Sequence, residues 1–150
     1  MQLDSTDVLL RLGTAAAVGM LIGLNRDLQN KPIGMRTLGM VSLGAAVVAV
    51  STIQVASVAE NADALSRVIQ GIIQGVMAGI SFIGAGVILR DPEARTVEGL
   101  TTAATVWVTA ALGIACGLAA WTTIAAGTSL ALLLLAGVGW LEAVLGKKNR

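Results

Sequence analysis

The sequence predicts an all-α integral membrane protein, a bundle of about five transmembrane helices forming one domain over residues 1–150. The first reason is composition, since hydrophobic residues make up 55% of the chain and charged residues only 13%. This charge content is about half of the roughly 25% typical of soluble domains, too little to cover a water-facing surface. The second reason is pattern: long uncharged windows, several close to the roughly 20 residues that cross a bilayer, alternate with short charged segments.

The helices follow from these windows in order. Residues 8–24 are apolar except for Arg11, which lies near the end of its window and is expected to reach the membrane interface. Residues 99–141 carry no charge and are too long for one span, so they are expected to form two with a turn between them. The helices are expected at about 8–24, 37–58, 68–89, 100–118 and 122–143.

The loop charges predict an orientation. Only Arg11 and Arg67 fall on the side of the N-terminus, and the other eight of the ten Lys and Arg residues fall on the opposite side. Because cytoplasmic loops collect Lys and Arg, we expect the N-terminus outside and the C-terminus in the cytoplasm. The acidic start, with Asp4 and Asp7, argues against a cleaved signal peptide.

Composition also excludes several kinds of site. The chain has no His and one Cys, Cys116, so it cannot by itself build a zinc site, a disulfide or a triad with a His base. We therefore expect no catalytic, cofactor-binding or metal-binding residues and no enzymatic activity. The near balance of ten basic and nine acidic residues, without a basic stripe, argues against nucleic acid as a partner and leaves the lipid bilayer.

Glycines repeat every four residues in three of the expected helices, and such small residues let membrane helices approach closely. Two interpretations follow. The favoured one places all three glycine faces in contacts inside one bundle, and the other makes one of the grooves a homodimer interface. The glycines are Gly19 and Gly23, then Gly71, Gly75 and Gly79, then Gly113 and Gly117.

The polar residues expected at membrane depth are neutral. Gln70 and Gln74 are one turn apart and, with Ser81 and Thr105, are candidates for the lining of a polar cavity. The favoured alternative is that such side chains hydrogen-bond to a neighbouring helix. Thr105 and Thr109 are also placed to bond back to carbonyls of their own helix.

Two expected helices begin at the cytoplasmic face, where their free N–H groups and positive dipole ends point toward the cytoplasm. Thr37 is a candidate N-cap for one and Thr101 or Thr102 for the other, and Arg36 adds a cation. Adjacent helix ends would make a small anion site for a phosphate, a carboxylate or a lipid headgroup, with ordinary capping as the favoured alternative. Gly84 and Gly86 are expected to allow local unwinding near the same face.

Four segments carry a family resemblance: Gly23-Leu24-Asn25-Arg26, Gly34-Met35-Arg36-Thr37, the glycine-rich run at residues 79–88, and the run at residues 97–107 that begins Val97-Glu98-Gly99-Leu100-Thr101-Thr102. In this order and spacing the chain resembles the N-terminal membrane domain of the MgtC/SapB family. The resemblance implies a multi-pass protein of the bacterial inner membrane, linked to growth under magnesium limitation and, in pathogens, to survival inside macrophages. Some members are tied to restraint of the proton-translocating ATP synthase.

Three departures from the family pattern stand out. Asn25 replaces a common Glu, Glu98 replaces a common Arg, and the chain ends at Arg150 where longer members continue into a soluble C-terminal domain. The resemblance and the helix-end chemistry together assign a functional site at the cytoplasmic face. Its residues are Asn25, Arg26, Arg36, Thr37, Gly84, Gly86, Glu98, Thr101 and Thr102.

The expected function is modulation of another membrane system, such as the ATP synthase or ion homeostasis, under magnesium limitation or intracellular stress. The partner would be another membrane protein. The alternative is a small transporter or channel for magnesium or another ion, with Gln70 and Gln74 on its path.

Overall fold

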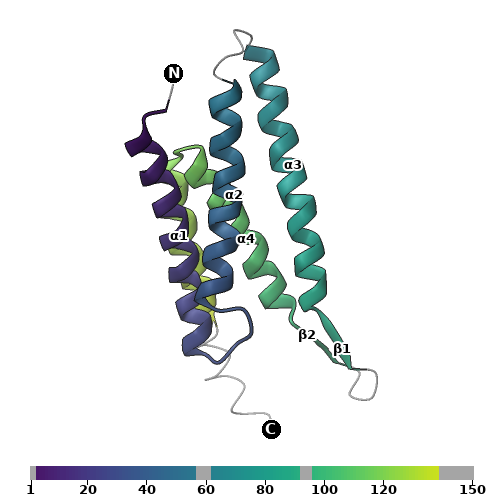
Figure 1. The fold of residues 1–150 in the computed structure, drawn as a ribbon. Coiled ribbons are helices and arrows are strands. Elements are labelled where there is room, and N and C mark those ends of the chain that lie inside the picture. Colours follow the sequence, from purple (N-terminus) through teal and green to yellow (C-terminus); the bar gives the residue numbers. More distant parts are fainter. Residues whose placement is uncertain (1–2, 57–61, 92–95, 139–150) are drawn as a thin grey trace.

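The structure is a computed structural model that describes residues 3–56, 62–91 and 96–138. Five helices follow one another in an up-and-down order, with a short hairpin before the fourth (Figure 1). The elements are α1 (Ser5–Leu28), α2 (Met35–Ala56), α3 (Ala62–Val87), β1 (Leu89–Asp91), β2 (Thr96–Glu98), α4 (Leu100–Gly117), α5 (Trp121–Leu132) and the π-helix η1 (Leu133–Val138).

The predicted helical bundle is confirmed. Four helices are long and apolar enough to cross a membrane, and α5 with its continuation forms a shorter apolar helix over Trp121–Gly137. The predicted turn between the last two helices is also confirmed, because the chain leaves the helix after Gly117 and Ala119 takes a positive φ of 56°. The predicted helix at 122–143 extends beyond residue 138, where it lies outside the described residues.

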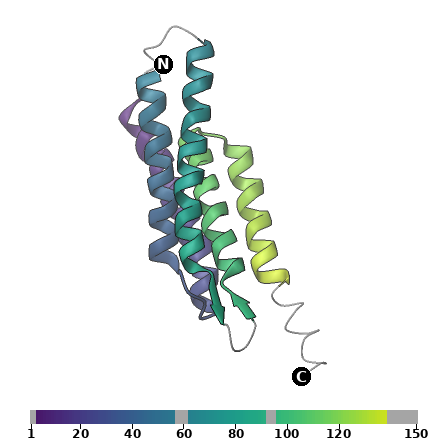
Figure 2. The ribbon, with the colours of Figure 1, turned by 90° about the vertical axis from the view of Figure 1, so that its right-hand side faces the viewer.

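Helix α4 is the centre of the bundle. It contacts α1, α2, α3 and α5, and Figure 2 shows α3 and α5 on different sides of it. Its span is 56% buried, whereas the span of α3 is only 6% buried. The core between α1, α2 and α4 is built from small and aliphatic side chains, among them Ala15, Ile22, Leu38, Val106 and Cys116. Cys116 therefore serves as a buried packing residue.

Two of the three glycine faces pack inside the bundle. A Cβ added at Gly19 or Gly113 would lie closer than 3.0 Å to atoms of Leu38 or Ser42, so both glycines let their helices touch the backbone of α2. Gly23 and Gly117 make similarly close approaches to the same helix. These contacts hold α1 and α4 against α2 at a distance that larger residues would not allow.

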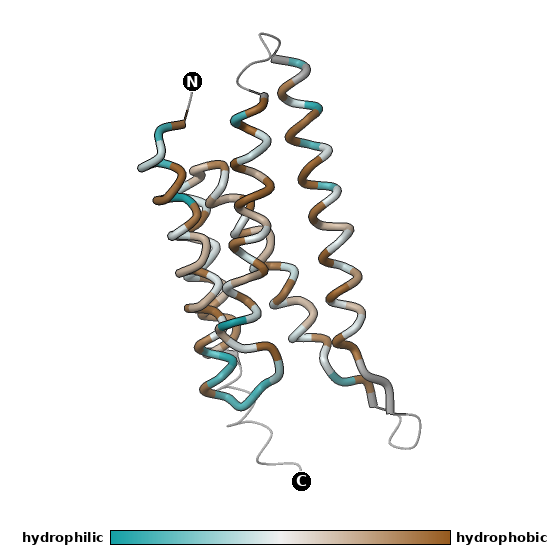
Figure 3. Tube along the Cα trace, in the orientation of Figure 1, coloured by the Kyte–Doolittle hydropathy of each residue, from teal (hydrophilic) through white to brown (hydrophobic). Residues whose placement is uncertain are grey.

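The third glycine face does not pack inside the bundle. Gly71, Gly75 and Gly79 have nothing within 4 Å of an added Cβ, so the favoured expectation that every glycine face is an internal contact is wrong for α3. The reason is that α3 packs through another face, which carries Ile69, Ile72 and related residues at helical spacing. Hydrophilic positions interrupt the upper half of this helix in Figure 3.

Two local features were not predicted. Strands β1 and β2 form an antiparallel hairpin between α3 and α4, with Arg90 opposite Val97. The last helix changes to π-helical geometry at Leu133, which adds a residue to each turn and widens the helix. The loop from α1 to α2, in contrast, is the hydrophilic connection that the charge pattern predicted (Figure 3).

Candidate functional site

A buried arginine lies at the end of the bundle where α1 ends and α2 and α4 begin, called the lower end from its place in Figure 1. Arg26, in the last turn of α1, is only 3% exposed. Its Nη2 donates to the carbonyl oxygen of Pro32 at 3.2 Å and to Oγ1 of Thr102 in the first turn of α4. Its Nε is buried and has no partner within the described part of the chain. Arg26 thus links three segments and leaves part of its donor capacity unused.

A carboxylate of α1 caps α2. Asp27 Oδ2 accepts the N–H of Met35 at 3.0 Å, and a Cβ on Gly34 would overlap that carboxylate. The prediction of Thr37 as N-cap is therefore wrong, because Asp27 reaches the helix start first and leaves Thr37 exposed inside the first turn beside the exposed Arg36. An external anion at this helix start would have to displace Asp27.

Helix α4 begins without a side-chain cap. Its N-cap is Gly99, whose φ is 86°, and a Cβ there would collide with the carbonyl of Val87. The expected caps Thr101 and Thr102 lie two and three positions past the N-cap, inside the first turn. Thr102 is buried and accepts from Arg26, whereas Thr101 is exposed. The first N–H groups of α4 therefore lack the side-chain oxygen that usually satisfies them.

The two glycines near the end of α3 differ in their surroundings. Gly84 is buried, and an added Cβ would meet Ala103 of α4 at ordinary contact distance, 3.7 Å. Gly86 faces open space. The expected local unwinding is not found, since α3 continues as regular helix to Val87. Hydrogen bonds within the helix evidently hold through both glycines.

The two substituted positions of the family pattern have different surroundings. Asn25 Oδ1 accepts from Nε2 of Gln29 at 3.1 Å, and Glu98 is exposed at the end of β2. Of the predicted cytoplasmic-face residues, the structure thus joins Arg26 to Thr102 by a hydrogen bond. Arg36, Thr37 and Thr101 lie near them at helix starts but point to the exterior.

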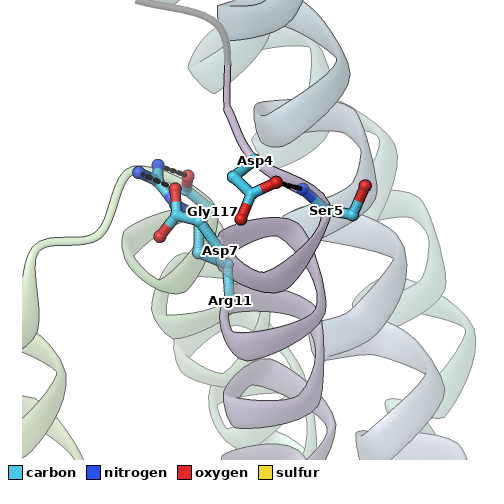
Figure 4. A network of polar contacts seen from close by, with 5 residues as sticks. All are labelled: Asp4, Ser5, Asp7, Arg11 and Gly117. Carbon is cyan, nitrogen blue, oxygen red and sulfur yellow. Dashed lines mark hydrogen bonds and ion pairs between the residues drawn. The ribbon is translucent and has the colours of Figure 1, made fainter.

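A second buried arginine lies at the opposite, upper end (Figure 4). Arg11 is 8% exposed. Its Nη2 pairs with Asp7 Oδ2 at 2.8 Å, and its Nη1 donates to the carbonyl oxygen of Gly117 at 2.8 Å. Because Gly117 ends α4, the guanidinium stabilises a helix C-terminus, whose carbonyls carry partial negative charge.

The predicted polar-cavity residues lie on different surfaces. Gln70, Gln74 and Ser81 are exposed on α3, and neither glutamine amide has a hydrogen-bond partner in the described ranges. Ser81 Oγ instead donates to the carbonyl of Met77 in its own helix. Thr105 is buried in α4 and donates to the carbonyl of Thr101 at 2.7 Å, as predicted for stacked threonines.

A cavity of about 230 Å³ lies between α1, α4 and the last helix. Its lining is almost entirely aliphatic, apart from the side chains of two α4 threonines. Among the described residues there is no group of three or more Cys, Asp or Glu that could hold a metal ion. The cavity is lined by Ile22, Thr101, Ala104, Thr105, Val108, Ala131, Leu134 and Leu135.

Sequence reasoning missed the roles of Asp27 and Arg11. The signal for Asp27 was an acidic residue eight positions before a helix start, with a glycine directly before that start to leave room. The signal for Arg11 was Asp7 one turn earlier, which favours an ion pair over solvent. Its second partner, Gly117, gave no local signal because it is 106 residues away.

The family model described as MgtC family matches residues 12–144. Protein SrpB of Synechococcus elongatus is 43% identical over 142 residues, which cover 89% of this chain and 76% of SrpB. Protein SapB of Bacillus subtilis is 37% identical over 74% of this chain. Protein MgtC of Salmonella typhimurium is 40% identical over 73% of it.

The match covers unequal shares of these relatives. It spans 47% of SapB and 43% of MgtC, so less than half of each of those two proteins has a counterpart in this chain. No solved structure matches. The matched segment contains the described lower end, from Arg26 to the first turn of α4.

Proposed function

This chain belongs to the MgtC family and is a multi-pass membrane protein, and on that premise we propose that it is a non-enzymatic modulator of another membrane system in the bacterial inner membrane. The system would be one that responds to magnesium limitation or intracellular stress, such as the ATP synthase or ion homeostasis. The contact with its partner would be made by helix packing within the bilayer.

The observation that carries this proposal is the outer face of α3, defined here by Gln70, Gln74, Gly71, Gly75 and Gly79. All five residues are exposed, and the glycines have open space above them. The whole span of α3 is 6% buried, so the described part of the chain leaves this face uncovered.

The outer face of α3 has the chemistry of a helix-docking surface. Lipid tails offer no hydrogen bonds, so a glutamine amide in a bilayer is stabilised by a polar partner on another helix, at about 0.6 kcal/mol for an average contact. The glycines beside the amides would let such a helix approach closely, and close packing is what drives association in lipid. A partner helix with small residues and one amide or hydroxyl would match both features.

ATP synthesis by inverted membrane vesicles, with and without this protein, tests the proposal. We expect the wild-type protein to lower the rate and the double substitution Gln70→Leu with Gln74→Leu to abolish that effect. Leucine keeps the helix apolar and removes the amides. Ser66→Ala, at an exposed polar position one turn before Gln70, leaves both amides and all three glycines in place, and this control should behave as wild type.

Magnesium flux into proteoliposomes separates the alternative, a small transporter or channel. The modulator should give no saturable flux when it is the only protein present. Saturable flux that disappears in the glutamine double variant would refute modulation and assign the glutamines to a transport path.

A photo-crosslinking residue placed at Ala78, which is exposed on α3, identifies what covers the face. Adducts with a subunit of the modulated system are expected. Adducts between two copies of this chain alone would assign the outer face of α3 to a homodimer and overturn the proposed contact.

The orientation belongs to the same proposal. We place the lower end, with Arg26, in the cytoplasm, since eight of the ten cations lie in segments on that side. A reporter enzyme that works only in the cytoplasm should be active when it is fused after Arg150, and one that works only outside the cell should be inactive there. Activity restricted to the outside would reverse the topology.

A further inference from the structure

The environment of Arg26 is electrostatically incomplete. Arg26 is only 3% exposed. Within the described residues its Nη2 has acceptors, whereas its buried Nε has none. Arg11, at the other end of the bundle, is paired with Asp7, whereas the acceptors of Arg26 within the described residues are a backbone carbonyl and a hydroxyl. A buried guanidinium with no carboxylate partner favours an anion beside it.

The guanidinium lies at a helix start that also favours an anion. Its contact with Thr102 places it at the first turn of α4, an 18-residue helix whose N-cap, Gly99, offers no side-chain oxygen. The first N–H groups of such a helix carry partial positive charge. Of the two helices that begin at the lower end, α2 is capped by Asp27, whereas α4 has no side-chain cap and no acidic residue in its first turn.

The apolar cavity adjoins this helix start. Ile22 lines it one turn before Arg26 on the same side of α1, and Thr101 lines it next to Thr102. The exposed residues Thr101, Ala104 and Leu134 form part of the lining, so the cavity opens to the surface of the helices that span the membrane. What enters by that route comes from the bilayer.

The last helix supports the cavity wall through its π-helical turn. Leu134 and Leu135, which line the cavity, both belong to η1. Nε2 of Gln29 donates to the carbonyl of Leu135 at 3.4 Å, which satisfies a backbone group in the irregular turn. The widened turn is thus tied to the segment that directly follows α1.

We propose that this cavity binds an acyl chain of an anionic phospholipid whose phosphate is held by Arg26 and the first N–H groups of α4. The volume of about 230 Å³ is below the roughly 300–1,000 Å³ of sites for drug-sized ligands, so it accommodates part of one chain and not a whole lipid. The aliphatic lining selects the chain, and the guanidinium and helix start select the negative charge.

Native mass spectrometry of the detergent-purified chain tests the site with three probes. These are phosphatidylglycerol, phosphatidylcholine with the same acyl chains, and inorganic phosphate. We expect the wild-type protein to retain phosphatidylglycerol at least tenfold better than phosphatidylcholine and to retain no phosphate at the same concentration.

Two variants address the two halves of the site. Ala104→Leu fills the cavity at an exposed lining position, and Arg26→Gln removes the cation; each should reduce phosphatidylglycerol retention at least tenfold. Ala17→Leu makes the same change in size at an exposed position of α1 outside the lining and should retain the lipid as wild type does. If Arg26→Gln does not fold, Ala104→Leu and the comparison of the two headgroups still test whether the cavity binds an anionic phospholipid.

Three results would overturn the proposal. Equal retention of the two phospholipids would mean that no anion is recognised. Full retention by Ala104→Leu would mean that the chain does not enter the cavity. Phosphate retained by the wild type without phosphatidylglycerol would mean a site for a free anion.

Discussion

Gly113→Ala tests whether α4 is held against the backbone of α2. The added Cβ would lie 2.9 Å from the Cα and carbonyl carbon of Ser42 and closer still to its carbonyl oxygen, whereas ordinary contact begins at 3.4 Å. The carbon contacts alone require the helices to separate by about 0.5 Å, and the closer carbonyl oxygen requires more. Because the contacted atoms are backbone, no side-chain rotation relieves the overlap.

The loss of unfolding free energy follows from that displacement. A gap of about 0.5–1 Å forfeits a quarter to a half of each van der Waals contact across the interface, and overpacking of this kind costs about 1–3 kcal/mol. Alanine gains up to about 1 kcal/mol over glycine in helix propensity. We expect a net loss of about 1–2 kcal/mol, and a fall in melting temperature of about 2–4 °C for each kcal/mol.

Thermal unfolding in detergent, followed by circular dichroism, measures the effect. Gly44→Ala is the matched control, since Gly44 lies on α2, two residues from Ser42, with nothing within 4 Å of its added Cβ. It should be neutral or slightly stabilising. A Gly113→Ala protein as stable as Gly44→Ala would refute the close packing of α4 on α2.

Three further substitutions test single contacts. Arg11→Met should cost about 1–3 kcal/mol of unfolding free energy, since it strips Asp7 of its ion pair and Gly117 of a donor, and the loss should shrink when Asp7→Asn is already present. Gly34→Ala should displace the capping carboxylate of α2, cost about 1 kcal/mol or more, and speed hydrogen exchange in the first turn of α2; unchanged exchange would contradict the cap. Gly99→Ala should lower the melting temperature for two reasons: an alanine in the left-handed conformation costs about 1–2 kcal/mol, and its Cβ would collide with the carbonyl of Val87. Wild-type stability of this variant would argue against this helix start.

The helices could be predicted from the sequence because hydropathy and charge are local properties. The uncharged window at 37–58 became α2 (Met35–Ala56), and the long window after residue 99 divided at Gly117 as its length required. The hairpin of β1 and β2 was missed because its strands are short and contain charged residues, a pattern that is typical of an ordinary loop.

The partners of individual residues could not be predicted in the same way. The glycines of α1, α3 and α4 have similar spacing, yet only those of α1 and α4 meet α2, because side chains elsewhere on each helix decide which face turns inward. Likewise Thr37 is a good N-cap by residue type, but Asp27 reaches the helix start from another helix. The motifs assigned Arg26 and Thr102 to one site, and the structure joins them, while the burial of Arg26 against Thr102 depends on how α1 and α4 cross.

The contact of Arg11 with Gly117 also sets an order of events during synthesis. The two residues are 106 positions apart, so at about 5–20 residues per second the ribosome needs roughly 5–20 s to supply the acceptor after the arginine has been made. During that interval α1 is in the membrane with Asp7 as the counter-charge that its own sequence provides. A nascent chain that stops before α4 therefore keeps this arginine with Asp7 alone and without its backbone acceptor.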